Sequence, residues 1–356
     1  SNTATAIMMV PIGMAIVLQL EDRFGRESTG KFTIALMLGI AYACSLGGMA
    51  TLVGTPPNLA FSRIFAITFP EAQGPSFGAW VLMEGTDEPV AFMAKKTILA
   101  TGGLGQIYQH STNWAGSVGH GVAMAYRVGA RVIDMEYVQF HPTVFYGKRA
   151  PRFLITEAIR GEGAELVNAA GKHFMKKVHK RGSLAPRDIV SRAIHRELTD
   201  SGEPCVFLDL EAMDRDKLKD RFPTVYNSCL KHGVDITREP IPVVPAAHYS
   251  CGGVHADMEG RTSIRNLNAV GESGCTGLHG ANRLASTSLL ECLTGGKFAA
   301  LRDIEEIASQ NFTLPEPRAW KSPEYEADPT LIAQDLNLVQ QTMWNYAGIV
   351  RTPRRL

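Results

Sequence analysis

The spacing of charged residues divides the chain into two unlike parts. Residues 1–72 carry eight charged side chains, whereas the other 284 positions carry 63. Residues 1–20 and 32–62 hold no charge at all. Each of these stretches reaches the roughly 20 apolar residues that a bilayer-spanning helix needs. The pattern therefore predicts an apolar helical segment of the membrane type over 1–72.

After residue 79 the pattern becomes that of an α/β protein, in which short apolar runs alternate with polar turns. The helical spacing at 121–128 predicts one helix, and the apolar positions of 187–198 share one face of another. Four short apolar runs predict strands, at 79–83, 90–93, 97–100 and 267–270.

Composition excludes several classes of protein. With 45% hydrophobic and 20% charged residues, the chain is too apolar to be disordered. Its net charge of +1 provides no broad basic field, which excludes binding to nucleic acid or an anionic membrane through bulk charge. Six cysteines lie far apart without a CxxC pair. We therefore predict no metal site, no disulfide scaffold and the reduced thiols of a cytoplasmic protein.

Two short motifs stand in the apolar segment. Residues 1–5 read SNTAT, and residues 54–58 read GTPPN. Membranes tolerate such irregular backbone where it lines a protected polar cavity. The motifs resemble the sodium-coupled dicarboxylate symporters, whose SNT hairpin and TPPN loop bind sodium and the substrate carboxylate. Because only part of one inverted repeat is present and the chain opens with Ser1, we expect a fragment that does not transport by itself.

Several positions in the α/β part are candidates for chemistry. Gly102 and Gly103 follow the strand predicted at 97–100, where bare backbone admits a large flat ligand; an ordinary turn is the alternative. His141, with Thr143 close behind, is predicted at a strand end, and His248 precedes a glycine pair. Each histidine is interpreted either as a site residue or as a buried structural one.

Arg187 is placed at the start of the predicted helix 187–198, where its charge opposes the helix dipole. Two interpretations are open. Asp188 neutralises it, or Arg187 and the helix N-terminus bind a common anion such as a substrate carboxylate. Further along, Ser286 is the predicted N-cap of a long amphipathic helix. The start of that helix would stabilise negative charge on a bound cofactor.

Six motifs then occur in one order. They are HPT at 141–143, TEAIRGEG at 156–163, APRD at 185–188, HYSCGG at 248–253, AVGE at 269–272 and GANRLASTSLLE at 280–291. Together they resemble the L-aspartate oxidase family, which is related to the flavoprotein subunits of succinate dehydrogenase and fumarate reductase. The resemblance covers about 79–356.

The resemblance implies an α/β fold with an incomplete FAD-binding Rossmann-like domain and an inserted α+β capping domain. The expected bounds are 73–133 and 250–299 for the FAD-binding domain, 134–249 for the capping domain and 300–356 for the start of a helical region. The GxGxxG unit that binds the FAD pyrophosphate in this family has no match in the sequence. His120 also stands where the family usually has Asp, so we expect weakened FAD binding.

The implied activity is FAD-dependent oxidation of L-aspartate to iminoaspartate, in which hydride passes from the substrate Cα to flavin N5. The product feeds the quinolinate branch of NAD biosynthesis, and the electron acceptor would be oxygen or fumarate. Two alternatives are kept. One is a flavoprotein of the succinate dehydrogenase or fumarate reductase type, and the other is a dicarboxylate transporter fragment with a passenger tail.

The resemblance also assigns roles to individual residues. Arg187 matches the general acid/base, and three further residues match the groups that hold the two substrate carboxylates, namely His141, His248 and Arg283. Additional substrate-binding positions are Thr143, Thr156 and Glu157. The expected FAD contacts are Gly102, Gly103, His120, Glu272, Ser288 and Leu289.

Overall fold

The computed structural model describes residues 77–82, 88–147, 150–310, 314, 316–317, 320 and 328–353. The membrane-type segment expected over 1–72 lies outside these residues. Among the helices that the structure describes, none combines the length and the apolar character needed to cross a bilayer.

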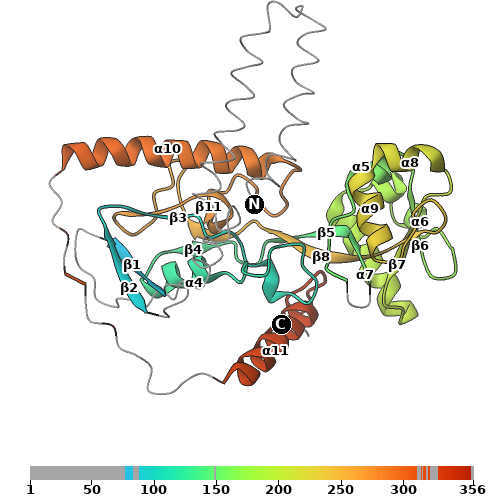
Figure 1. Cartoon of the computed structure of the whole chain (residues 1–356), viewed down its shortest axis with the longest axis horizontal. Helices are drawn as coiled ribbons and strands as arrows, with labels where there is room; N and C mark the ends of the chain where they lie inside the picture. The colour runs from blue at the N-terminus through green and yellow to red at the C-terminus, as the bar shows by residue number, and fades with distance from the viewer. Residues whose placement is uncertain are drawn as a thin grey trace, which may run out of the picture.

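One region of the molecule, on the left of Figure 1, is built from two stretches of chain that are far apart in sequence. A hairpin of β1 (Phe77–Leu82) and β2 (Pro89–Ala94) leads into β3 (Thr97–Leu99). β3 pairs in parallel with β10 (Leu267–Ala269). This pairing brings the glycines after β3 close to the residues after β10, because the carboxyl ends of parallel strands meet at one edge.

Helices and a second small sheet complete this region. β9 (Gly253–His255) pairs in parallel with β11 (Gly274–Cys275) and antiparallel with β4 (Val132–Ile133). The long helix α10 (Thr287–Ser309) runs along the top of this region in Figure 1, and α4 (His120–Arg127) lies below the strands. A small core of alanine, valine and leucine side chains fills the space between them.

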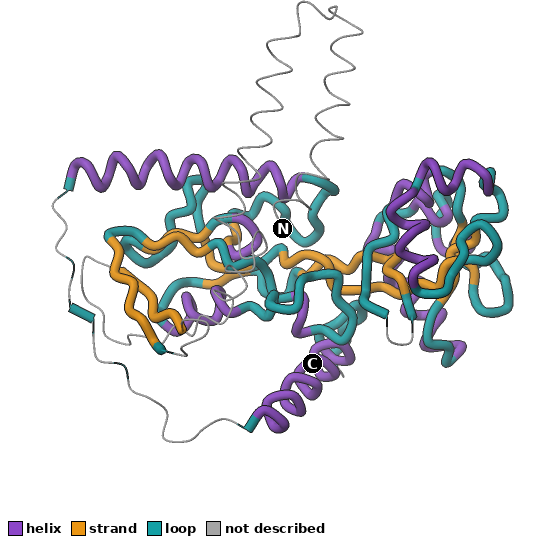
Figure 2. Tube along the Cα trace, viewed as in Figure 1, coloured by secondary structure: helices purple, strands orange, loops and turns teal. Residues whose placement is uncertain are grey.

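Two long antiparallel strands link this region to the rest of the molecule. β5 (Val138–Phe145) and β8 (Ile241–Ser250) run side by side from the left part to the right part in Figure 2. Their register shifts next to Gln139 and again after His141. Such irregularities re-aim side chains, so both residues stand where the ladder departs from regular pairing.

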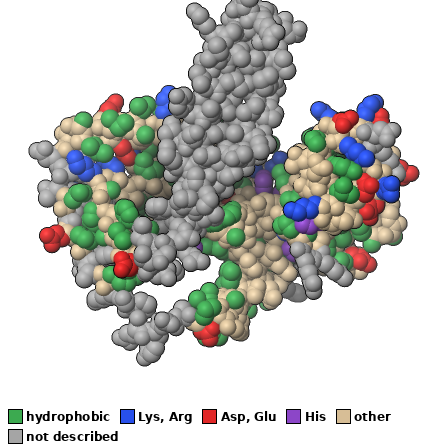
Figure 3. Space-filling model, viewed as in Figure 1, with side chains coloured by type: hydrophobic (Ala, Val, Ile, Leu, Met, Phe, Trp, Pro, Cys, Tyr) green, Lys and Arg blue, Asp and Glu red, His purple; other side chains and the backbone are tan. Residues whose placement is uncertain are grey.

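The second region extends the same sheet in the order β5-β8-β7-β6, with β7 (Val206–Asp209) and β6 (Glu165–Val167). α7 (Arg187–Ser201) packs Val190 and Ile194 into its core, where both are fully buried. The other helical elements here are α5 (Glu157–Gly161), α6 (Met175–Val178), η3 (Gly182–Leu184), α8 (Arg215–Arg221) and α9 (Pro223–Lys231). On the face drawn in Figure 3, acidic and basic side chains are interspersed over this region.

The last helix, α11 (Pro329–Tyr346), contacts the middle of the molecule. Trp344 stacks edge-on against Phe140 of β5 at 5.9 Å, and Tyr108 meets the same ring at 5.3 Å. Tyr108 follows the short helix η2 (Gly105–Ile107). This aromatic cluster joins segments from the beginning, middle and end of the described chain.

The four strands and two helices predicted from periodicity are confirmed, with boundaries shifted by a residue or two, except that the second helix continues to Ser201. The predicted mixed α/β class is confirmed. The predicted N-cap is wrong: Ser286 takes a left-handed backbone conformation, with φ of 67°, and its side chain makes no capping hydrogen bond. Its hydroxyl therefore does not satisfy the free N–H groups of α10.

Candidate active site

Two arginines and a glutamine form the centre of the candidate site. Gln139, on β5, is 3% exposed. Its Oε1 accepts a hydrogen bond from Arg187 Nη1 at 3.4 Å and another from Arg283 Nη2 at 3.2 Å. The glutamine therefore brings the start of α7 and the loop before α10 to one point, although these arginines are far apart in sequence.

Two histidines lie beside the arginines. The rings of His141 on β5 and His248 on β8 are 5.3 Å apart and edge-on. Burial, followed by the charges of Arg283 and Arg187, lowers the pKa of His248 to about 4. Burial also holds the pKa of His141 well below its usual range, with His248, Arg187 and Arg160 adding to the effect. Both imidazoles are therefore neutral near pH 7 and act as hydrogen-bonding groups without charge.

Arg187 pairs with a carboxylate on a neighbouring helix. Its Nε donates to Glu157 Oε2 at 2.7 Å, and the Glu157 side chain is 41% exposed. Asp188 instead pairs with Arg192 at 2.6 Å, so the interpretation in which Asp188 neutralises Arg187 is wrong. Fully buried Arg160 also approaches Glu157 Oε2, at 3.9 Å. The carboxylate thus stands between two guanidinium groups and solvent.

Arg283 is held in place from several sides. Its guanidinium lies 4.6 Å from the centre of the Tyr249 ring, and Nη1 donates to Ser288 Oγ at 3.0 Å. Burial and the nearby charge of Arg187 lower the pKa of Arg283. Two positively charged groups so close together are stabilised by an anion between them.

Unsatisfied donors point to the same conclusion. Within the described part of the chain, His141 Nε2 and Arg283 Nε are buried without a hydrogen-bond partner. Buried polar atoms are nearly always paired in folded proteins, and an exception calls for a ligand or a functional reason. A small molecule with negatively charged oxygens would satisfy both the orphaned atoms and the excess positive charge.

A buried carboxylate supports the ring beneath Arg283. Glu291, on the first turns of α10, is 7% exposed. It accepts hydrogen bonds from Tyr249 at 3.3 Å and Thr276 at 2.9 Å, and it contacts His279 Nε2 at 2.7 Å. Tyr249 belongs to β8, and the other two partners belong to the loop between β11 and α10. The carboxylate therefore links α10 to β8 and to that loop.

The edge beyond β3 and β10 has the properties of a cofactor cradle. Gly102 has φ of 76°, and no atom lies within 4 Å of where its Cβ would be. A Cβ on Gly103 would overlap the Glu272 carboxyl group, so a larger residue would displace that side chain. Glu272 Oε1 accepts the Ser250 N–H at 2.8 Å, and burial raises the pKa of Glu272 to about 7. Bare backbone beside a hydrogen-bonding carboxyl group fits the sugar and ring portions of a dinucleotide.

The other predicted contacts fall in three places. Ser288 and Leu289 are in the first turn of α10, and Leu289 is 51% exposed, which leaves an apolar surface for a flat ring. His120 is the first residue of α4 and is exposed. Thr143 is fully buried and donates to the Ile155 carbonyl at 3.1 Å, and Thr156 caps α5 by accepting the Ala158 N–H at 3.3 Å. Their assigned roles stay predictions.

Sequence reasoning missed Gln139 and Glu291. Gln139 is a polar residue inside the apolar stretch Val138–Phe140, and that interruption was the available signal. Glu291 is the last residue of the GANRLASTSLLE motif, and its position in the sequence predicts the polar face of a helix. Nothing in the sequence marks its burial.

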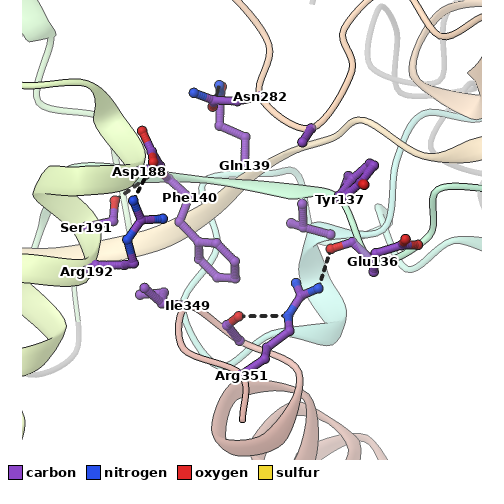
Figure 4. Close-up of a pocket in the computed structure, with 13 residues that line it drawn as sticks. Glu136, Tyr137, Gln139, Phe140, Asp188, Ser191, Arg192, Asn282, Ile349 and Arg351 are labelled. Atoms are coloured by element: carbon purple, nitrogen blue, oxygen red, sulfur yellow. Dashed lines mark hydrogen bonds and ion pairs between the residues drawn. The ribbon is translucent and has the colours of Figure 1, made fainter. Parts of the chain in front are cut away.

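A cavity of about 270 Å³ is lined by Gln139 and by residues of β5, α7 and the segment after α11 (Figure 4). Asn282, whose Oδ1 accepts from Gln139 Nε2 at 2.8 Å, also lines it. Arg351 projects towards the cavity from the segment after α11 and donates to the carbonyls of Ala347 and Glu136. Gln139 therefore lines this cavity and also bonds both arginines of the site.

Comparison with known proteins identifies the family. The family model described as "FAD binding domain" matches residues 61–289, which include Gln139, both arginines and both histidines of the candidate site. The chain belongs to the FAD binding domain family. Its cofactor is FAD, and the described glycines and Glu272 fit that group. A second family model, "Citrate transporter", matches residues 1–84 and agrees with the transporter resemblance of that segment.

Curated relatives of this FAD binding domain protein include L-aspartate oxidases. The chain is 48% identical over 284 residues to L-aspartate oxidase 1 of Ralstonia nicotianae, covering 78% of the chain and 52% of that protein. It is 42% identical over 325 residues to the chloroplastic L-aspartate oxidase of Arabidopsis thaliana, covering 84% of the chain and 50% of that protein. The chain thus spans about half the length of the curated relatives it matches.

Solved structures give the same fold. A quinol–fumarate reductase with menaquinol molecules superposes with a TM-score of 0.70 at 31% identity, covering 90% of this chain and 59% of that one. An E. coli quinol fumarate reductase gives 0.69 at 30% identity, covering 90% and 58%. The chain therefore shares its architecture with these two quinol–fumarate reductases.

Proposed function

We propose that this FAD binding domain protein catalyses, or contributes the substrate site for, oxidation of L-aspartate to iminoaspartate. The observation that carries the proposal is the meeting of Arg187, Arg283, His141 and His248 around Gln139. Two guanidiniums and two neutral imidazoles form a site rich in donors for a small dianion. The identity to L-aspartate oxidases, at 42–48%, supports aspartate as that dianion.

The two carboxylates of the substrate would be bound by different groups. Arg283 has its unpaired Nε available for one of them, and His248 is close enough to the same guanidinium to be affected by its charge. His141, with its unpaired Nε2, adds a further contact on the β5 side. Two fixed binding points orient the Cα–H bond, and orientation alone lowers a reaction barrier substantially.

Oxidation to the protonated imine removes a hydride from Cα and one proton from the ammonium group. Arg187 is the residue proposed to take up this proton, because its Nε–H already donates to Glu157 at 2.7 Å. Arg187 first passes its Nε proton to Glu157 Oε2, and the neutral guanidine that remains accepts the substrate proton, which restores the guanidinium. The 41% exposed Glu157 side chain then exchanges the proton with water.

FAD, when bound, supplies the acceptor for the two electrons. Gly102, Gly103 and Glu272 are the residues proposed to hold it, together with the first turn of α10. The helix N-terminus favours negative charge close to Ser288 and Leu289. The final electron acceptor, oxygen or fumarate, is proposed from the family resemblance.

The proposal is tested on the full 356-residue chain reconstituted with FAD. After removal of free flavin, L-aspartate is added without oxygen and the visible flavin spectrum is recorded. Loss of flavin absorbance with L-aspartate, and none with succinate, is the expected result. Bleaching by succinate alone would favour the succinate dehydrogenase type. Retained flavin that neither compound reduces, or no retained flavin, would contradict the proposal.

A further inference from the structure

The Thr112 side chain contacts His248, and the proposed function does not yet use this contact. The segment that carries Thr112 pairs with β8 beside this histidine. Thr112 N donates to the Ala247 carbonyl at 3.0 Å, and Ala247 N donates to the His110 carbonyl at 2.8 Å. Because Ala247 directly precedes His248, these two bonds fix the Thr112 side chain relative to the imidazole.

The Thr112 hydroxyl has two neighbours and one proton. Oγ1 lies 2.8 Å from His248 Nδ1 and 3.4 Å from the Ala247 carbonyl oxygen. That carbonyl already accepts the Thr112 N–H. The shorter distance favours donation to Nδ1.

The choice of partner decides which nitrogen of His248 carries a proton. Burial and the guanidiniums of Arg283 and Arg187 keep the ring neutral, and a neutral imidazole has one N–H donor and one acceptor. When Nδ1 accepts from Thr112, the proton must be on Nε2. Within the described residues, the hydrogen bond of the His248 side chain is made through Nδ1.

We propose that Thr112 is a positioning residue, whose hydroxyl donates to Nδ1 of His248 and so makes Nε2–H a donor for a substrate carboxylate. The inference rests on the proposed function, because it assigns that donor to the dicarboxylate site. With this tautomer, a carboxylate close to Arg283 meets donors from both side chains. The opposite tautomer would turn a nitrogen lone pair towards the carboxylate oxygens, which also carry lone pairs, so no hydrogen bond would form.

The tautomer is read directly from the chain by long-range ¹H–¹⁵N NMR with ¹⁵N-histidine, and the His248 signals are assigned by their loss in His248→Gln. We expect Nδ1 to be the unprotonated nitrogen and Nε2 to carry the proton. A spectrum with the proton on Nδ1 would overturn the proposal. This measurement needs neither FAD nor turnover.

Binding provides a second readout. The probe is succinate, which has the two carboxylates without the amine, titrated by calorimetry into the reconstituted chain. Thr112→Val keeps the shape but removes the hydroxyl, and we expect about tenfold weaker binding, since loss of a hydrogen bond to a charged group is worth at least that factor. Thr112→Ser keeps the hydroxyl, and we expect binding within about twofold of wild type.

Ser111→Ala is the matched control, because the Ser111 hydroxyl bonds Asn113 and not His248. Equal affinity of the valine variant and wild type would overturn the role of Thr112, and so would a control or serine variant that weakens binding as much as the valine variant does. Failure of the wild-type chain to bind succinate would contradict the proposed substrate site. The NMR result would still decide the tautomer.

Discussion

Replacing Arg187 by lysine tests the proposed proton relay most directly. Arg187 uses two different nitrogens at once, Nε for Glu157 at 2.7 Å and Nη1 for Gln139 at 3.4 Å. Lysine keeps the charge but has a single nitrogen, so it cannot hold both partners and also meet the substrate.

The size of the effect follows from these contacts. A hydrogen bond to a charged group contributes about 1.5–3 kcal/mol, and a positioned proton-transfer group contributes roughly 10²–10⁴-fold in rate. We therefore expect Arg187→Lys to lower the rate of flavin reduction by L-aspartate about 10³-fold. FAD should be retained, because Arg187 and Glu157 are not among the residues proposed to hold it, which are Gly102, Gly103 and Glu272.

The assay is anaerobic stopped-flow reduction of the reconstituted chain, with bound FAD quantified by absorbance beforehand. Arg196→Lys is the control, since Arg196 is an exposed arginine on the same helix, and we expect it to match the wild-type rate. A rate for Arg187→Lys within tenfold of wild type would refute the relay. So would equal losses in both variants.

Three further predictions concern stability and the cofactor edge. Glu291→Ala leaves three hydrogen-bonding partners without their acceptor, so urea unfolding should show a loss of about 3 kcal/mol in the free energy of unfolding. Glu305→Ala, at an exposed position of the same helix, should change that free energy little. Similar losses in both variants would contradict the buried network. Gly103→Ala should lower both FAD affinity and the unfolding midpoint, because its Cβ would overlap Glu272. Gly161→Ala is the control: the space around this residue is open, so neither quantity should change. Normal FAD binding by Gly103→Ala would count against the cofactor cradle. The folded state holds the Glu272 proton up to about pH 7, whereas the unfolded state releases it at lower pH. Wild type should therefore lose stability relative to Glu272→Gln as pH rises from about 5 to about 7. Parallel curves of stability against pH would exclude the raised pKa.

Local sequence predicted two of the elements beside the site, but the prediction that His141 lies at a strand end is wrong, because β5 continues to Phe145. The period of apolar positions predicted the strand before Gly102 and the helix after Arg187, because a strand or helix must turn one repeating face towards the core. Ordered motifs also predicted the family and the FAD cofactor. The Ser286 cap failed because residue type favours a cap without determining the backbone conformation at that position.

The sequence by itself determined which chemical groups this protein has, namely arginine and histidine side chains, and glycine backbone at the ends of strands and helices. Only the tertiary structure decided which of them meet. Asp188 is adjacent to Arg187 in sequence, yet Arg187 pairs with Glu157, since side chains at i and i+1 of a helix point in different directions. Gln139, Thr112 and Glu291 acquired their contacts from strand pairing and burial. Such long-range contacts depend on how distant segments pack, which no local pattern encodes.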